Sequence, residues 1–528
     1  MFVRRRPVAF LALSAVAFSA GCTTPTSERT DEVRAGDSIV LAEIAEPATL
    51  HPLLGYAEQG KGKFYDGLLT HDAERVTRPA LALEEPEPST DGTTWTVRLR
   101  EDVTFHDGSP LGAEDVVATY RAAIDPASGS LVAAGLDVVE SVTELDDHTV
   151  QFDLRHPHAS FPDLLVLGIV PSEDVAAGPL VDSPLNTQPV GTGPYRLVEW
   201  IQGERMVWEA NEDYWDGAPE IDQVTVVFGL GFEERVRGMG DRELDGAVLH
   251  PWEARDLPEQ TELEVVHHDS GEFRAVTLPS GHPVAGDPAI RLALNLAVDR
   301  AGMVADVLGG HGQPAHTPFP PTLPEFVDPE ASFVLDAPQA RRMLENEGWD
   351  LDDGEEVRTR EGTPARFTLL HPDDDPLSAE LAAAFAEGAA SIGVEVGVEG
   401  LPWEDILPRA GRDAVVVSHG NPLDPDLQGY PSLHSSSVAE ANLGRYDNPQ
   451  VDASLDAARL GLDQAERTAH YRAAQRAYVA EPGLVYLVFP RHSYLLGPGW
   501  AGYQRVTEPR GHGMTWGPWW NLEDWSRN

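Results

Sequence analysis

The sequence predicts an α/β protein that folds into two lobes with a cleft between them. Its 528 residues are too many for one ordinary hydrophobic core. Strand patterns dominate the first half, whereas from about residue 287 helices dominate and short strands lie between them. A strand-rich half followed by an α/β half indicates two separately packed bodies in one chain.

The first half contains short segments in which apolar and polar residues alternate, as they do in half-buried strands. This alternation predicts strands at 38–43, 94–99, 148–154 and 221–228. A hairpin is predicted at 194–210, because two strand-like runs flank Gln202-Gly203, which is suited to a tight turn.

Helix signals mark the second half. Asp287 before Pro288 is a typical N-cap followed by a first-turn proline, and apolar residues then continue along one face until Gly309. Further helices are predicted at 336–348, at 377–392 and from Asp463, where Glu466 completes a capping box. Strands at 367–370, 394–398 and 414–418 fall between them and indicate a small α/β lobe.

The N-terminus is typical of an export signal. Residues 4–6 are Arg-Arg-Arg, an apolar run follows from Val8 to Phe18, and Ala20-Gly21-Cys22 comes next. Residues 1–21 are therefore predicted to be a lipoprotein signal peptide, with Cys22, the only cysteine of the chain, as the lipidated residue. A plain secreted protein with a coincidental cysteine is the alternative. The polar residues 22–36 are predicted to be a flexible tether.

The net charge and the absence of catalytic motifs exclude several classes of function. The formal net charge is −49 at pH 7, which would repel nucleic acid. The sequence contains no H-E-x-x-H, G-x-S-x-G or C-x-x-C motif and no set of nucleophile, base and orienting group that can be recognised. We therefore expect a binding protein without cofactor, resident metal or catalysis.

A long run of matched positions lies at Leu81–Pro126, which reads LALEEPEPSTDGTTWTVRLREDVTFHDGSPLGAEDVVATYRAAIDP. This run closely resembles the signature region of the extracellular solute-binding proteins of family 5, the oligopeptide, dipeptide and nickel class. Val190–Tyr195, Asn211–Trp215 and Tyr446–Pro449 also resemble family segments. The resemblance implies a monomeric binder of a peptide-like small ligand that works with ABC permease and ATPase subunits. A binder of nickel or a metal chelate, or a non-transport enzyme or sensor on the same fold, is the alternative. Its implied location is the outer face of the cytoplasmic membrane, or the periplasm where the host has an outer membrane.

The resemblance also implies a periplasmic-binding-protein-like clamp of three domains. We expect residues 37–64, 187–278 and 494–528 to form the discontinuous domain of the first lobe. Residues 65–186 are expected to form a β-rich domain inserted into that lobe, and residues 279–493 to form the α/β second lobe.

The ligand region is expected where the strand at 414–417 leads into Ser418–Asp426. In peptide-binding members of the family an aspartate pairs here with the ammonium of the peptide, and the matching residue is the neutral Asn421. Either Asp424 takes over this role, or the ligand is a modified peptide, a metal chelate or another small solute. The expected ligand-binding residues are Glu46, His51, Trp403, Ser418, His419, Asn421, Asp424 and His434.

Three of these residues, His51, His419 and His434, leave a further alternative open. Histidines gathered at a cleft can hold a metal ion or a metallophore. Each of them taken singly is more often a hydrogen-bonding residue of a pocket or a surface.

Overall fold

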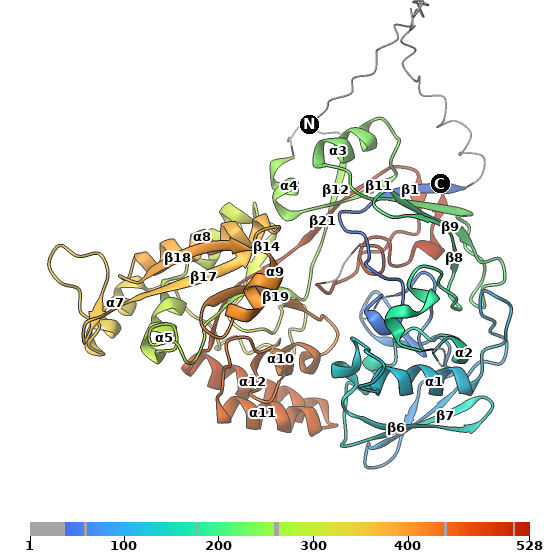
Figure 1. Ribbon diagram of the computed structural model, residues 1–528, viewed down its shortest axis with the longest axis horizontal. Helices are drawn as coiled ribbons and strands as arrows, with labels where there is room; N and C mark the ends of the chain where they lie inside the picture. Colours follow the sequence, from blue (N-terminus) through green and yellow to red (C-terminus); the bar gives the residue numbers. More distant parts are fainter. Residues whose placement is uncertain (1–36, 58–60, 176–177, 258–262, 438–440, 511–512) are drawn as a thin grey trace, which may run out of the picture.

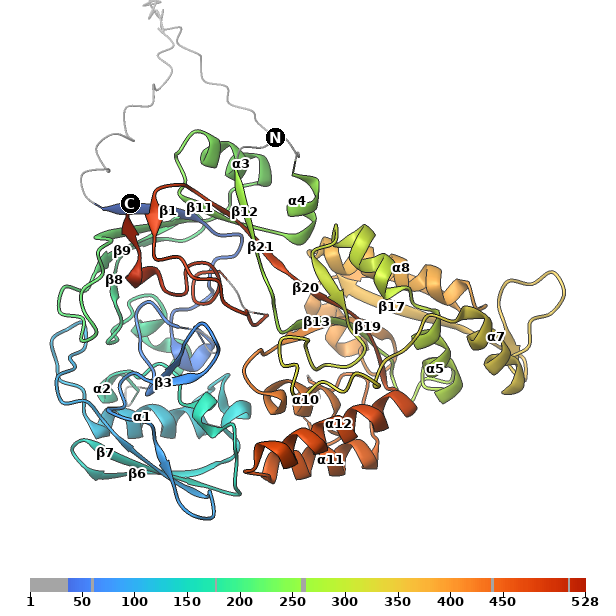
Figure 2. The same ribbon diagram turned by 180° about the vertical axis from the view of Figure 1, so that it is seen from behind.

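The computed structural model describes residues 37–528 apart from 58–60, 176–177, 258–262, 438–440 and 511–512. Its elements gather into two lobes that lie side by side, as the views from opposite sides agree (Figures 1 and 2). Both lobes combine helices with a sheet, which confirms the predicted two-lobed α/β fold. The predicted signal peptide and tether, including Cys22, lie outside the described residues.

A seven-stranded sheet organises the first lobe, in the order β12-β21-β11-β1-β10-β9-β8. Its central strand β1 lies between β10 and β11 and runs parallel to both. The strands are β1 (Ser38–Ala42), β8 (Tyr195–Ile201), β9 (Arg205–Ala210), β10 (Gln223–Val227), β11 (Gly246–Leu249), β12 (Glu264–His268) and β21 (His492–Leu496).

Successive residues of β1 face opposite sides of this sheet, so both faces are buried. Ile39 and Leu41 pack in a core that includes Trp519 and Trp525 of the C-terminal segment. The opposite face, including Ala42, packs against the helices α3 (Phe232–Gly240) and α4 (Pro251–Asp256).

The C-terminal segment is tied to the first lobe by the only two lysines of the chain. Lys61 forms an ion pair with Glu523. Lys63 donates to the Trp520 carbonyl at 2.7 Å and lies 3.1 Å from Glu523, with its side chain fully buried. Segments more than 450 residues apart in sequence are thereby joined in the same core. The short strands β22 (Trp500–Ala501) and β23 (Ser526–Arg527) pair within this segment.

The inserted domain of the first lobe is built on a four-stranded sheet in the order β4-β5-β7-β6, against which α1 packs. Phe152 of this sheet and Tyr120 of α1 meet edge to face, with ring centroids 4.9 Å apart. The elements are β2 (Leu69–His71), β3 (Thr77–Pro79), β4 (Glu87–Pro88), β5 (Thr94–Arg98), α1 (Ala113–Ile124), β6 (Val139–Asp146), β7 (Thr149–Leu154) and α2 (Ser172–Val175).

A six-stranded sheet organises the second lobe, in the order β14-β20-β13-β19-β17-β18. Here β17 lies between β18 and β19 and runs parallel to both. The strands are β13 (Glu272–Thr277), β14 (Gly312–Pro314), β17 (Arg366–Pro372), β18 (Glu395–Leu401), β19 (Ala414–Gly420) and β20 (Leu484–Pro490), and β15 (Thr359–Arg360) pairs separately with β16 (Thr363–Pro364).

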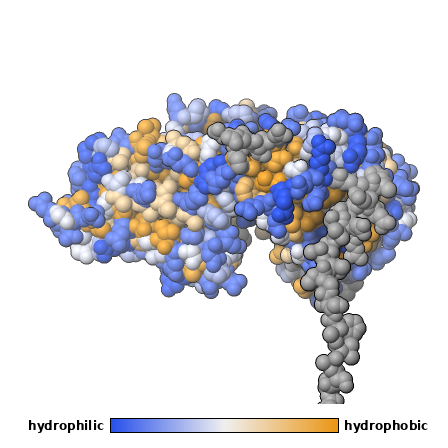
Figure 3. All heavy atoms as spheres, turned by 90° about the horizontal axis from the view of Figure 1, so that it is seen from above, coloured by the Kyte–Doolittle hydropathy of each residue, from blue (hydrophilic) through white to orange (hydrophobic). Residues whose placement is uncertain are grey.

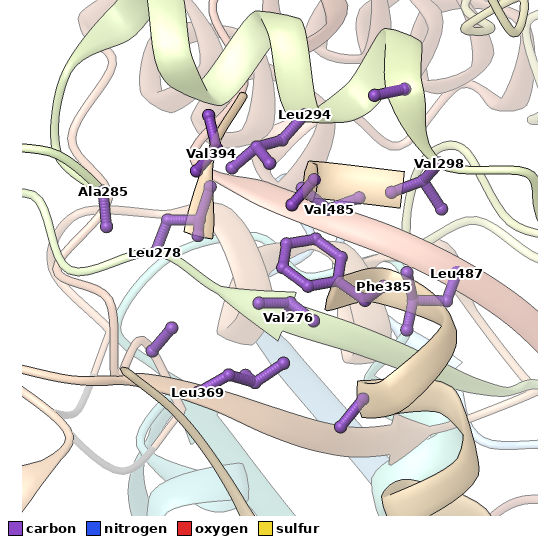
Figure 4. Close-up of a cluster of buried hydrophobic side chains, with 14 of the residues drawn as sticks. Val276, Leu278, Ala285, Leu294, Val298, Leu369, Phe385, Val394, Val485 and Leu487 are labelled. Carbon is purple, nitrogen blue, oxygen red and sulfur yellow. The ribbon is translucent and has the colours of Figure 1, made fainter. Parts of the chain in front are cut away.

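Helices cover both faces of this second sheet. Val485 and Leu487 of β20 pack with Phe385 in one core (Figure 4), whereas Leu484 and Tyr486 face a second core with Tyr478. The helices are α5 (Pro288–Ala297), α6 (Arg300–Gly302), α7 (Ala337–Asn346), α8 (Pro376–Ala390), α9 (Trp403–Ile406), α10 (Pro425–Leu433), α11 (Pro449–Leu460) and α12 (Gln464–Ala480).

The helix predicted from Asp287 to Gly309 is interrupted. Asp287 caps it as predicted, but α5 ends at Ala297 and Val298 is extended. Asp299 then caps a new turn by accepting from the Gly302 amide at 2.9 Å.

The chain crosses between the lobes twice, from β12 into β13 and from β20 into β21, and the second crossing is visible as one long ribbon in Figure 2. Because β13 is bonded to β19 and β20, residues 272–277 belong to the second-lobe sheet, although the sequence-based division places residues up to 278 in the first lobe. Among the described residues, no helix is long and apolar enough to cross a membrane.

Candidate ligand-binding cleft

A cavity between the lobes, which we call the main cleft, has a volume of about 690 Å³. It lies where parallel strands of both lobes end. The segments after β1 and β11 contribute Glu43–Thr49 and His250–Trp252, and the segment after β17 contributes Asp374 and Asp375. Open α/β sheets bind ligands at the carboxyl ends of strands whose connections leave in opposite directions. Seen from above, the outline of the molecule narrows between the lobes (Figure 3).

Other parts of the chain complete the wall of the main cleft. They come from the loop after β1, from the two crossing segments and from the C-terminal segment. These further lining residues are Leu54–Ala57, Leu249, Glu272, Arg274, Leu377, Pro490, His492, Arg510, Met514 and Thr515.

Glu43 is the first residue after β1 and is only 4% exposed. Its Oε1 accepts a hydrogen bond from Trp519 Nε1 at 2.8 Å. Burial raises the pKa of Glu43 to about 8, and the Trp519 hydrogen bond only partly opposes this rise. Glu43 therefore presents a mainly protonated carboxyl group to the cleft at neutral pH.

Glu46 was predicted to line the ligand cleft, and it does line the main cleft. Its carboxylate already accepts from Trp200 Nε1 at 2.6 Å and from the Gly203 amide at 2.9 Å. Glu46 thus fixes the loop after β1 to the β8–β9 hairpin.

A buried cluster of ionisable groups lies at the crossing strands. Glu508, which is fully buried, lies 2.5 Å from His268 Nδ1 and 2.6 Å from His492 Nδ1, and it accepts from the Tyr494 hydroxyl at 2.5 Å. Burial favours the neutral acid, but the two histidines outweigh it and lower the pKa of Glu508 to about 2.

The cluster continues from His492 into the main cleft. His492 Nε2 lies 2.8 Å from Glu272, which in turn lies 2.8 Å from Arg274 Nε. Arg274 also pairs with Asp375, the N-cap of α8. Burial alone would lower the pKa of His492, but its hydrogen bonds to Glu272 and Glu508 raise it to about 9. The charged groups of this cluster therefore neutralise one another.

The main cleft also has aromatic and apolar lining residues. His250 and Trp252 stack with ring centroids 4.1 Å apart and planes 10° from parallel. Leu54, Leu377 and Met514 line the same cavity. The main cleft therefore offers both polar and apolar contacts to a ligand.

Arg510 joins the lobes at the edge of the main cleft. Its Nε donates to Ser418 Oγ, and its backbone amide donates to the Gly420 carbonyl at 3.1 Å. Ser418 and Gly420 belong to β19 of the second lobe, whereas Arg510 follows the first-lobe strand β21.

A second cavity between the lobes, which we call the side cavity, has a volume of about 380 Å³. His419 and Asn421, both predicted ligand residues, line it from the second lobe, and residues around Leu136 and Leu164 line it from the inserted domain. Asn421 Oδ1 accepts from the Leu423 amide at 2.9 Å, so this side chain also stabilises the local turn.

Trp403 and Ser418 meet elsewhere. They line a small pocket of about 100 Å³ within the second lobe, which His419 also borders. Trp403 is 43% exposed and opens α9. The structure therefore separates these two residues from the side cavity, although Ser418 reaches the main cleft through Arg510.

Like Trp403 and Ser418, three further predicted residues line neither the main cleft nor the side cavity. His51 is fully buried, and its Nδ1 accepts from the Leu53 amide at 3.2 Å. Asp424 caps α10 and pairs with Arg467 at 2.7 Å and 2.8 Å, so its charge already has a partner inside the second lobe. His434 stacks on Tyr430 at 4.1 Å.

The three histidines considered for metal binding have separate surroundings. His51 lies in the first-lobe loop, His419 at the side cavity, and His434 lies 3.2 Å from Asp456 of α11. Within the described parts of the chain, no group of three His, Cys, Asp or Glu residues is placed to hold a metal ion.

Several cleft residues were not predicted from the sequence. Glu43 lies at the end of a predicted strand, and His250-Pro251 has the form of a helix start. Both are positions where a sheet edge can present ligand-binding residues, so the sequence could have indicated them. No sequence pattern indicates that Glu272, His492 and Arg510 belong to the cleft, because they meet only through the long-range pairing of the crossing strands.

The lobes touch each other at further points. Arg75, in the turn between β2 and β3, donates to the carbonyls of Pro422 at 2.8 Å and Thr322 at 2.7 Å. Arg255 of α4 lies 2.9 Å from Glu380 of α8. The two lobes are therefore in direct contact beside their cavities.

Comparison with known proteins decides the family. The sequence model of the bacterial extracellular solute-binding proteins, family 5 (middle region), matches residues 77–440. The chain belongs to this family. It is 40% identical over 505 residues to protein XP55 of Streptomyces lividans, covering 94% of this chain and 93% of that protein. It is 24% identical over 510 residues to the oligopeptide-binding protein AppA of Bacillus subtilis, covering 93% of each.

Solved structures of family 5 solute-binding proteins share the fold. NikZ from Campylobacter jejuni in complex with Ni(L-His) superposes with a TM-score of 0.81 at 24% identity, covering 93% of this chain and 99% of NikZ. AppA from Bacillus subtilis in complex with a nonapeptide superposes with a TM-score of 0.78 at 22% identity, covering 93% of this chain and 99% of AppA. The predicted family and the periplasmic-binding-protein-like clamp are confirmed.

Proposed function

We propose that this family 5 protein is the substrate-binding component of an ABC importer and captures a peptide-like small solute between its lobes. The main cleft carries the proposal, because residues of both lobes line it and its volume of about 690 Å³ suits a small ligand. The crossing segments between β12 and β13 and between β20 and β21 act as the hinge.

The proposed ligand contacts come from both cavities. In the main cleft we assign them to Glu43, Trp252, Arg274 and Arg510, which line it from several elements. In the side cavity we retain Asn421, with His419 beside it. We leave out Asp424, because Arg467 already neutralises its carboxylate.

The protein releases its ligand chemically unchanged. The names of its relatives support this, since they are binding proteins for oligopeptides, nickel or glutathione. These relatives bind different solutes, so their names do not identify the ligand class of this protein.

The remaining parts of the proposal concern location. A lipid on Cys22 holds the monomer at the outer face of the cytoplasmic membrane, and residues 22–36 give it reach toward the permease and ATPase subunits. Ala20-Gly21-Cys22 is the observation that supports anchoring.

Native mass spectrometry of the protein purified from its host tests the function. We expect a co-purifying organic solute of peptide size, released intact when the protein is denatured. Recovery of nickel or a metal chelate instead would support the alternative that the protein carries a metal complex. Steady conversion of the recovered solute by the protein would contradict the binding function.

A further inference from the structure

Three of the described acidic side chains that line the two cavities between the lobes are buried, and two of them pair with an arginine. In the main cleft Glu272 lies 2.8 Å from Arg274 Nε, and in the side cavity Asp426 lies 2.9 Å from Arg459. Pairing of this kind is the general rule, because a buried charge loses its hydration and needs an opposite charge in its place.

Glu43 is the exception. It lines the main cleft and is only 4% exposed, but no arginine, lysine or histidine of the described residues lies within 4.0 Å of its carboxyl group. Its Oε1 accepts from the neutral Trp519 Nε1 at 2.8 Å, and its Oε2 has no hydrogen-bond partner among the same residues. Glu43 therefore offers a ligand one free oxygen in a site that is largely shielded from solvent.

The second acid in the segment after β1 has the same character. Glu46 is half-buried in the main cleft and accepts only from neutral groups, Trp200 Nε1 and the Gly203 amide. Residues 43–49 contain no basic residue. This side of the cleft therefore has two acids and no base.

The charged groups near Glu43 do not replace a partner. Burial is the main cause of its raised pKa, Glu508 of the C-terminal segment adds to the rise, and Arg235 of α3 opposes it. Arg235 is itself paired with Glu253. The other ionisable residues that line the main cleft are Glu46, Tyr56, His250, Glu272, Arg274, Asp374, Asp375, His492 and Arg510.

We propose that Glu43 pairs with a primary ammonium group of the ligand, and that the ligand class is small peptide-like solutes that carry such a group. This inference rests on the proposed binding function. A single free oxygen suits the compact ammonium better than a guanidinium, which pairs best with both oxygens of a carboxylate. The ammonium takes the place of a proton: the protonated carboxyl of Glu43 releases its proton to water, and the carboxylate formed pairs with the ammonium.

Three pools of mixed short peptides test the proposal. All have the same sequences with one lysine in each peptide, and their amines are free at the N-terminus only, free at the lysine only, or acetylated at both places. Retention of each pool is measured by equilibrium dialysis with mass spectrometry for the wild-type protein, Glu43→Gln and Glu43→Asp.

The variants separate the charge of Glu43 from its hydrogen bonds. Glu43→Gln keeps an acceptor for Trp519 and a neutral donor, but it cannot become negative. Glu220→Gln is the matched control, because Glu220 is exposed in the first lobe and lines neither cavity. Melting curves verify that each variant is folded.

We expect the wild-type protein and Glu220→Gln to retain one of the two amine pools about tenfold or more better than the acetylated pool. Glu43→Gln should lose this preference, and Glu43→Asp should keep part of it. Between pH 6 and pH 7 the wild-type affinity for the preferred pool should rise by up to about tenfold, because the ammonium displaces a proton from a group with a pKa of about 8. Glu43→Gln should not show this rise.

Two sets of results would overturn the inference and leave the proposed function standing. One is equal retention of all three pools by the wild-type protein, or an amine preference that survives in Glu43→Gln. The other is a wild-type affinity that falls between pH 6 and pH 7, which would assign Glu43 the role of a neutral donor. Retention of no pool by the wild-type protein would contradict the peptide-like ligand of the proposed function itself.

Discussion

Replacing Arg75 by alanine is expected to shift the closed clamp toward an open state. Arg75 lies at the tip of the β2–β3 turn of the inserted domain, and its two terminal nitrogens donate to the Pro422 and Thr322 carbonyls of the second lobe. Its backbone has φ 68, a left-handed conformation that costs a non-glycine residue free energy. The contact therefore depends on a residue whose local conformation is unfavourable.

The size of the shift follows from these two hydrogen bonds. A bond from a charged donor contributes about 1.5–3 kcal/mol when buried. Arg75 is half-buried, so we take about 1 kcal/mol for each bond, or about 2 kcal/mol together. Loss of about 2 kcal/mol lowers the closed-to-open ratio by about 30-fold.

Stopped-flow dissociation of the solute recovered from the native protein measures this effect. Arg75→Ala should release it up to about 30-fold faster than the wild type. Small-angle scattering of the loaded protein should show a larger radius of gyration for the same variant.

Two further variants separate closure from folding. Arg75→Gly removes the same contacts but relieves the left-handed backbone, so it should open the clamp equally and melt at a higher temperature than Arg75→Ala. Arg78→Ala removes an exposed arginine of the adjacent strand, which pairs with Asp72 and not with the second lobe. If Arg75→Ala released ligand no faster than Arg78→Ala, the closing role of Arg75 would be refuted.

Three other predictions concern different parts of the chain. Cys22→Ala should release the protein from host membranes into the medium, and immunoblots that still find it on the membrane would contradict lipid anchoring. Asp424→Ala should destabilise the protein by about 3 kcal/mol in denaturant unfolding, because Arg467 is left buried without its partner; full wild-type stability would argue against that pair. Glu43 has a raised pKa of about 8, so its contribution to stability falls as pH rises from 4.5 toward 8. Glu43→Gln keeps an acceptor for Trp519, and its melting temperature relative to wild type should rise over that range; a constant difference would contradict the assignment.

Local patterns predicted much of the fold. Asp287, Asp336 and Asp463 each cap a helix where the sequence placed one, because the cap and the following residues lie within one turn of chain. The helix after Asp287 was predicted too long, since the second cap at Asp299 overrides an apolar pattern that continues past it.

The candidate site was predictable only in part. Asn421 and His419 follow a recognisable strand, and the side cavity does form at its end. The charged wall of the main cleft was not predictable, because Glu272 and His492 are 220 residues apart in sequence and meet through strand pairing. Asp424 illustrates the same limit, since its place in the segment 418–426 suggested a ligand contact, and the sequence does not reveal the arginine of α12 that pairs with it.

The contact of Lys61 and Lys63 with Glu523 has a practical consequence for surface chemistry. These are the only lysines of the chain, and their side chains are 18% and 0% exposed. Reagents that acylate amines consequently meet hardly any accessible side-chain amine on the described surface. A lysine introduced at a chosen exposed position therefore becomes a selective attachment point for a fluorophore or a biosensor support, and immobilisation through it leaves both lobes free to move.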